Sequence, residues 1–138
     1  MPQFKPVERD SVQRSRNAQG RNEAQPQPGL SVSLLHPRDT NFDKDGYPTE
    51  ETLAVIRDWP PGDPFAFFAY CAAAWNEQRN FVETTEDKMH WRFVTGGESG
   101  NESVIEAMSA NKFYWLTAWR SSERSGLHVF ELPAYLKK

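Results

Sequence analysis

The chain has 138 residues and a formal net charge of −3, with 38% hydrophobic and 13% aromatic residues. These values predict one domain with an aromatic core. They exclude a membrane-spanning segment, because the longest apolar run, Phe65 to Trp75, is much shorter than the roughly 20 residues that a bilayer requires. We also expect no secretory signal, since no apolar core follows the N-terminal charges.

The first 30 residues are polar, rich in Gln, Asn and Pro, and carry a net charge of +2. Such a stretch buries too little apolar surface to offset the entropy lost on ordering. The domain organisation predicted is therefore a flexible arm and linker at residues 1–45 and a globular domain at residues 46–138. The rest of the chain carries about −5, which argues against nonspecific binding to phosphate backbones, although the basic arm could contact nucleic acid or an acidic protein surface. Within the arm, Leu30–Leu35 could be an edge strand or a linker.

Two helices are predicted after the arm. Residues 41–46 resemble the front half of a calcium loop but lack its final carboxylate, so an Asp-Gly turn is the better interpretation. Thr49 can cap a first helix that ends before Trp59-Pro60. Asp63 followed by Pro64 has the composition of a second helix start, and that helix is expected to continue to about Arg79. Cys71 lies in its apolar part and is expected to be a buried, reduced side chain in place of a nucleophile.

Apolar and polar residues alternate along parts of the second half of the chain, as they do in β-strands. Residues 81–84 and 89–95 are predicted strands, followed by a helix at residues 101–110. Residues 112–120 are apolar on both faces at a period of two, which predicts a central strand, and residues 127–132 form the last strand. The expected fold is α+β, with two helices and then a mainly antiparallel sheet of about four strands in the order ββαββ, helices lying largely on one face.

The glycine turn between the second strand and its helix is the candidate binding site. Backbone N–H groups there could bind a phosphate or nucleotide, with the helix dipole behind them. The lysine of a Walker loop is missing, however, and two glutamates place negative charge where the phosphate would lie, so a turn capped by Ser99 or Asn101 is favoured. The residues assigned to this candidate site are Gly96, Gly97, Glu98, Ser99, Gly100, Asn101, Arg92, Arg124 and His128.

No catalytic, metal or cofactor site is predicted. The three histidines are isolated in the sequence and lack ligand spacing. His90 and His128 could approach each other if their strands stack, but hydrogen-bonded wall residues are the expected role. No catalytic arrangement of serine, histidine and acid follows from residue order alone. The sequence therefore does not decide whether the chain is an enzyme, and a non-enzymatic role is favoured.

Several segments, taken in order, resemble a family of small uncharacterised proteins from bacteriophages and prophages with a TGGxSGNE turn and helix. The matching segments cover most of residues 45–132 and are residues 45–51, 56–60, 91–97, 99–107, 113–115, 119 and 121–130. Two positions depart from the family pattern: Glu98 stands where tryptophan is usual, and Ser125 stands where a second glycine is usual. An aromatic contact and a turn geometry of the family are therefore in doubt here.

The resemblance implies a phage-encoded protein in the cytoplasm of the bacterial host and no established activity. We expect an accessory protein that binds a host or phage macromolecule, with a protein as the expected partner. Inhibition of a host defence or of another host process is one role that such binding could have. One alternative is a small-ligand protein or enzyme that uses the glycine turn. Another is a virion-associated or nucleic-acid-binding protein that acts through its basic arm. The sequence leaves the oligomeric state open.

Overall fold

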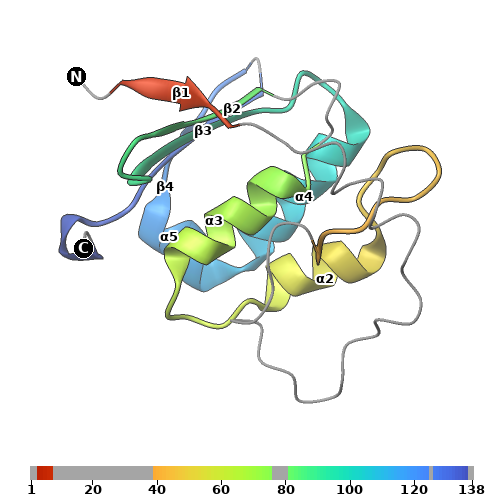
Figure 1. Ribbon diagram of the computed structural model, residues 1–138, viewed down its shortest axis with the longest axis horizontal. Coiled ribbons are helices and arrows are strands. Elements are labelled where there is room, and N and C mark those ends of the chain that lie inside the picture. Colours follow the sequence, from red (N-terminus) through yellow and green to blue (C-terminus); the bar gives the residue numbers. More distant parts are fainter. Residues whose placement is uncertain (1–2, 8–38, 76–80, 125, 137–138) are drawn as a thin grey trace.

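The computed structural model describes residues 3–7, 39–75, 81–124 and 126–136, which form an α+β fold (Figure 1). Five strands form one antiparallel sheet in the order β1-β2-β3-β5-β4, and the helices lie on one of its faces. The elements are β1 (Phe4–Pro6), α2 (Glu50–Asp58), α3 (Pro64–Ala73), β2 (Phe81–Thr85), β3 (His90–Val94), α4 (Ser99–Ala110), α5 (Lys112–Ala118), β4 (Trp119–Ser122), β5 (Leu127–Glu131) and a 3-10 turn, η5 (Ala134–Leu136). The predicted class is confirmed, but the four strands and the ββαββ order are not.

Local caps set the first two helices. The Thr49 hydroxyl accepts a hydrogen bond from the Thr52 N–H and starts α2, and the Asp63 side chain accepts one from the Ala66 N–H and starts α3. In the preceding turn the Asp43 carboxylate accepts hydrogen bonds from the N–H groups of Asp45 and Tyr47, as an Asp-Gly turn requires. Both predicted helix starts are confirmed.

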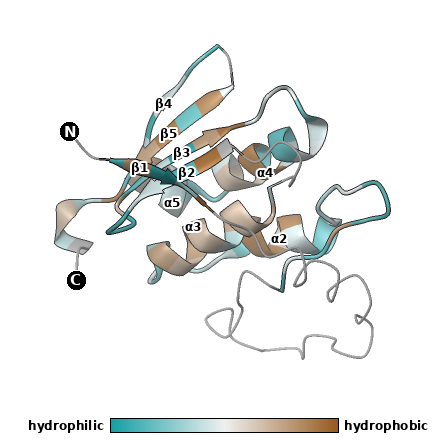
Figure 2. Cartoon of the chain, turned by 45° about the horizontal axis from the view of Figure 1, so that its top comes forward, coloured by the Kyte–Doolittle hydropathy of each residue, from teal (hydrophilic) through white to brown (hydrophobic). Residues whose placement is uncertain are grey.

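The helix α3 is shorter than predicted. It ends at Ala73 and not at Arg79, and residues 76–80 lie outside the described part of the chain, as does Leu30–Leu35. Trp75 follows the helix end and donates from its indole N–H to the Val94 carbonyl oxygen at 3.0 Å. This bond fixes the end of α3 against the sheet. Figure 2 shows α3 as apolar along almost its whole length, which suits its place between the sheet and the other helices.

Residues 112–120 are the main correction to the predicted fold. They form α5 and the first two residues of β4, and β4 lies at the sheet edge and not at its centre. The Asn111 side chain caps α5, and its Nδ2 donates to the carbonyl oxygens of Ile56 and Trp59 at 3.0 Å each. Tyr114 stacks on Phe67 with ring centroids 4.2 Å apart. Consecutive aromatic residues fit both a strand and a helix, so these tertiary contacts decide for the helix.

The strand β1 was not expected. Phe4 to Pro6 lie in the range predicted as a flexible arm, yet they pair with Thr85 to Glu83 of β2 and make a fifth strand. The Val7 N–H continues this pairing by donating to the Val82 carbonyl oxygen at 2.8 Å. The predicted boundary at residue 45 stays a prediction, because residues 8–38 are outside the described part.

An aromatic cluster joins the sheet to the helices. The Phe68 ring lies 5.7 Å from the Trp91 ring and 5.3 Å from the Phe130 ring, and all three side chains are buried. Cys71 is fully buried beside them, and burial raises the pKa of its thiol, so the thiol stays protonated. This is the environment predicted for a structural cysteine. Among the described residues, no helix combines the length and the apolarity needed to cross a bilayer.

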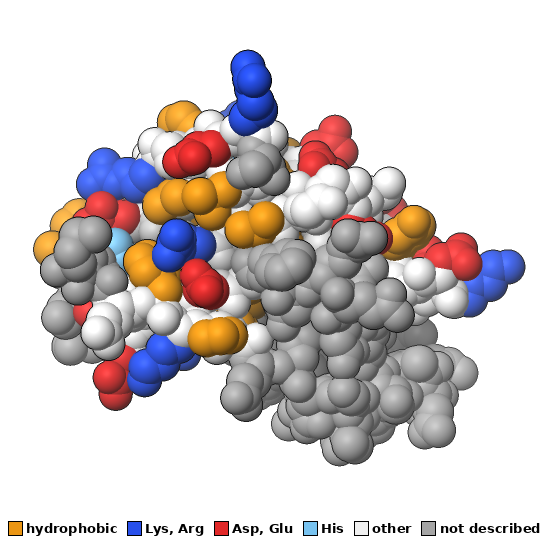
Figure 3. Space-filling view, turned by 90° about the horizontal axis from the view of Figure 1, so that it is seen from above, with side chains coloured by type: hydrophobic (Ala, Val, Ile, Leu, Met, Phe, Trp, Pro, Cys, Tyr) orange, Lys and Arg blue, Asp and Glu red, His pale blue; other side chains and the backbone are white. Residues whose placement is uncertain are grey.

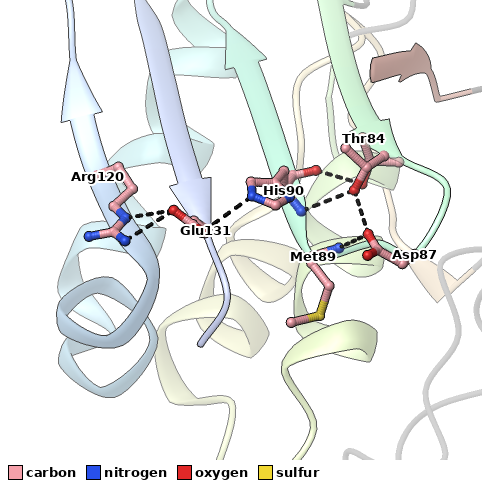
Figure 4. Close-up of polar contacts among 7 residues, drawn as sticks. Thr84, Asp87, Met89, His90, Arg120 and Glu131 are labelled. Carbon is pink, nitrogen blue, oxygen red and sulfur yellow. Dashed lines mark hydrogen bonds and ion pairs between the residues drawn. The ribbon is translucent and has the colours of Figure 1, made fainter. Parts of the chain in front are cut away.

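The opposite face of the sheet carries charged and apolar side chains, as Figure 3 shows from that side. There Glu131 lies between Arg120 and His90: its Oε1 is 3.0 Å from Arg120 Nη2, and its Oε2 is 3.3 Å from His90 Nε2 (Figure 4). Arg92 places its guanidinium 4.7 Å from the centre of the Phe4 ring, a cation–π contact on this face between side chains of β3 and β1. We call this face the open face.

Candidate functional site

Thr95 organises the predicted glycine turn. Its hydroxyl donates to Glu102 Oε2 at 2.8 Å and accepts a hydrogen bond from the Gly97 N–H at 3.3 Å. Its carbonyl oxygen accepts from Asn101 Nδ2 at 3.3 Å. Gly96 and Gly97 have φ values of 62° and 77°, a left-handed backbone that glycine adopts without strain. Much of the hydrogen-bonding capacity of the turn is therefore used within the chain.

The N-terminus of α4 is capped by Glu98 and not by Ser99 or Asn101 as predicted. A carboxylate oxygen of Glu98 accepts from the Asn101 N–H at 2.8 Å. This carboxylate occupies the position at which a phosphate would meet the helix dipole. Gly100 is buried, and a Cβ there would lie 2.8 Å from the Tyr47 ring, so this glycine allows close packing instead of ligand approach.

The glycine turn contacts the turn between β4 and β5. The Thr95 N–H donates to the Gly126 carbonyl oxygen at 3.0 Å. Gly126 has a φ of 89°, and a Cβ on it would lie 2.4 Å from Thr95 Oγ1. Arg124 is exposed on this second turn.

Arg92 does not join His128. The register pairs His128 with Phe93 and Arg92 with Val129, so the two side chains lie on opposite faces of the sheet. Arg92 is 3.5 Å from Glu83 on the open face. His90 is also on the open face, so the suggested approach of His90 to His128 is wrong. A binding site that combines Arg92, Arg124 and His128 is therefore not formed.

His128 instead contacts Ser122, which in turn bonds to Trp119, and neither residue is among the predicted site residues. Its Nδ1 is 2.7 Å from the Ser122 hydroxyl oxygen, and the Trp119 indole N–H donates to the same oxygen at 2.8 Å. Ser122 and His128 are directly opposite each other on β4 and β5, and a register shift lies between Trp119 and Ser121. In a regular strand, residues three apart face opposite sides. The register shift lets Trp119 and Ser122 share one side of β4, where Ser122 meets His128, and no local sequence signal reports a bulge.

The environment of His128 favours a neutral ring. Burial lowers the pKa of His128, and the nearby carboxylate of Glu102 acts in the opposite direction. A neutral imidazole has one nitrogen that accepts a proton, so Nδ1 can accept the hydrogen of the Ser122 hydroxyl.

Comparisons of the chain with protein-family models, curated proteins and solved structures give no match. In the described part, no three His, Cys, Asp or Glu side chains are grouped so that they could hold a metal ion.

A second surface lies on α5. Three large apolar side chains are exposed at intervals of three residues: Phe113 at 48%, Leu116 at 79% and Trp119 at 40%. Residues three apart are neighbours on a helix, and Trp119 continues the row because its N–H still bonds to the Trp115 carbonyl oxygen. We call these three residues the α5 patch. The prediction of a central strand with two buried apolar faces is wrong at these three positions, because the helix turns their side chains outward.

Proposed function

We propose that this chain is a phage-encoded accessory protein that acts in the bacterial cytoplasm by binding a host or phage protein through the α5 patch. The observation that carries the proposal is the exposed row of Phe113, Leu116 and Trp119. Contiguous exposed apolar groups on a small domain are typical of protein contacts, and aromatic residues supply much of the binding energy at such contacts.

The flanks of the patch indicate the chemistry of the partner. Lys112 precedes Phe113 and is exposed, whereas Arg120, after Trp119, is paired with Glu131 on the open face. A partner with an apolar centre and a carboxylate near Lys112 would complement this surface, whereas the rest of the domain, with its negative net charge, would repel it elsewhere. Trp119 is also anchored, since its ring stacks on Trp115 with ring centroids 5.9 Å apart and so loses little freedom on binding.

The test is a pull-down from host cells, with and without infection, that compares the native chain with Leu116→Asp and Phe113→Asp. If the patch binds the partner, each variant weakens binding by roughly 30-fold or more, the effect of losing a contact worth about 2 kcal/mol. Tyr135→Asp is the matched control, because Tyr135 is 82% exposed and lies in η5, outside the patch. Recovery of the same protein by native and both patch variants would reject the proposal.

Two other functions were expected as alternatives: a small-ligand site at the glycine turn and binding through the basic arm. The glycine turn loses support as a phosphate site because Glu98 already fills the N-terminus of α4. A role for the basic arm stays a prediction, since residues 8–38 are not described. Its test must keep β1, so neutral substitutions are preferable to deletion of the first 29 residues. These substitutions replace Arg9, Arg14, Arg16 and Arg21 by Gln, and salt-sensitive binding to nucleic acid should then disappear.

A further inference from the structure

The contact between Ser122 and His128 has the geometry of a nucleophile and its base. The two atoms, Ser122 Oγ and His128 Nδ1, are 2.7 Å apart, within the range for transfer of a proton along a hydrogen bond. Ser122 is exposed, so a reagent can reach its oxygen, while His128 is partly buried on the helix side of the sheet. The pair lies outside the glycine turn, and protein binding at the α5 patch does not require it.

Two neighbours favour a reactive hydroxyl. The Trp119 indole N–H can only donate, and it donates into Ser122 Oγ at 2.8 Å. A hydrogen bond into this oxygen stabilises the negative charge that develops as the hydroxyl loses its proton. The Glu102 carboxylate, held by the Thr95 hydroxyl at 2.8 Å, interacts electrostatically with His128 and stabilises the imidazolium formed when the ring takes that proton.

We propose that Ser122 is a nucleophile for acyl transfer from an ester or thioester, with His128 as its general base. Ser122 Oγ forms a bond to the acyl carbon while its proton moves to His128 Nδ1. The bond from that carbon to the alkoxide or thiolate breaks, and the leaving group takes the proton from His128. Water then attacks the acyl-serine with the same base, which releases the carboxylic acid and restores Ser122. No oxidant or cofactor is needed for this sequence.

A purely structural role for the same contacts makes a different prediction. If Ser122 only joins Trp119 to His128 and holds the sheet edge, its oxygen is a hydrogen-bond bridge with ordinary serine reactivity. Ordinary serine hydroxyls do not react with fluorophosphonates, because the hydroxyl is a weak nucleophile without an adjacent base. Covalent labelling therefore distinguishes the two roles.

The experiment treats the full chain with a fluorophosphonate probe and with 4-nitrophenyl acetate, and follows intact mass and nitrophenolate release. In the fluorophosphonate reaction Ser122 Oγ bonds to phosphorus, fluoride leaves, and His128 takes the proton. We expect one adduct per chain, mapped to Ser122 by peptide sequencing. His128→Gln should slow labelling by roughly 10²-fold or more, the lower part of the range for general-base assistance.

Ser121→Ala is the matched control, because Ser121 is the adjacent serine of β4 and is paired with Val129, not with His128. It should label as the native chain does, and Ser122→Ala should not label. Absence of an adduct on the native chain, an adduct on another residue, or equal rates in the native and His128→Gln proteins would each overturn the proposal. Mapping on the native chain decides the matter even if a variant fails to fold.

Discussion

The glycine turn at residues 95–98 and the segment at residues 112–122 make opposite use of their side chains. In the glycine turn, the Thr95 hydroxyl and the Glu98 carboxylate bond to groups within a few residues along the chain. In the second segment, Leu116 extends into solvent, and Ser122 meets a histidine on the neighbouring strand. A turn whose polar groups are bonded within the chain is thus a weaker candidate for binding than a segment that also leaves a large apolar side chain such as Leu116 in solvent.

Among the variants considered, we expect the largest loss of stability where the glycine turn contacts the turn between β4 and β5. Gly126→Ala forces a left-handed alanine and places its Cβ 2.4 Å from Thr95 Oγ1, so unfolding in urea should show a loss of about 2–4 kcal/mol. Gly97→Ala is the control for strain alone, since its φ is 77° and no atom lies within 4 Å of the added Cβ. It should cost about 1–2 kcal/mol. Equal losses in the two variants would show that the turns do not depend on their contact.

Substitutions at Asn111 test which contacts make residues 112–118 helical. Its Nδ2 donates to the carbonyl oxygens of Ile56 and Trp59, and its side chain is 5% exposed. Asn111→Ala should lower the free energy of unfolding by about 2–3 kcal/mol, because buried carbonyl groups lose their donor. Asn111→Asp keeps an oxygen to cap α5 but cannot donate, so it should be at least as harmful. A mild Asp variant would assign the effect to the cap alone.

The sequence predicts the elements that depend on local residues and not those that depend on distant contacts. Thr49, Asp63 and the alternation around Trp91 act over a few residues, and each predicted the element that forms. The helix α5 and the bulge in β4 depend on contacts with residues far away in sequence, so a periodicity of aromatic residues could not find them. The candidate sites show the same difference. The glycine turn follows from adjacent residues and was predictable, whereas the contact between Ser122 and His128 depends on the register shift in β4 and was not.

A smaller effect is expected at the cap of α4. Glu98→Ala removes the side chain that accepts from the Asn101 N–H and should cost about 1 kcal/mol. It also vacates the position for an anion, so sulfate should raise the melting temperature of this variant more than that of the native chain. Ser99→Ala is the control, because the Ser99 side chain does not cap the helix. Equal stabilisation of all three proteins by sulfate would contradict the idea that Glu98 fills an anion site.

The smallest effect concerns pH. Burial lowers the pKa of His128 in the folded state, so below about pH 6.5 the unfolded chain binds a proton that the folded chain does not. The contribution of His128 to the free energy of unfolding is therefore complete above this pH and is lost as pH falls toward the folded-state pKa. Urea unfolding at several pH values should show a native curve that falls relative to His128→Gln between pH 7.5 and pH 5. Glu102→Gln removes the charge that opposes the shift, so its curve should fall further than the native one, and a constant difference between the curves at every pH would show that His128 does not titrate in this way.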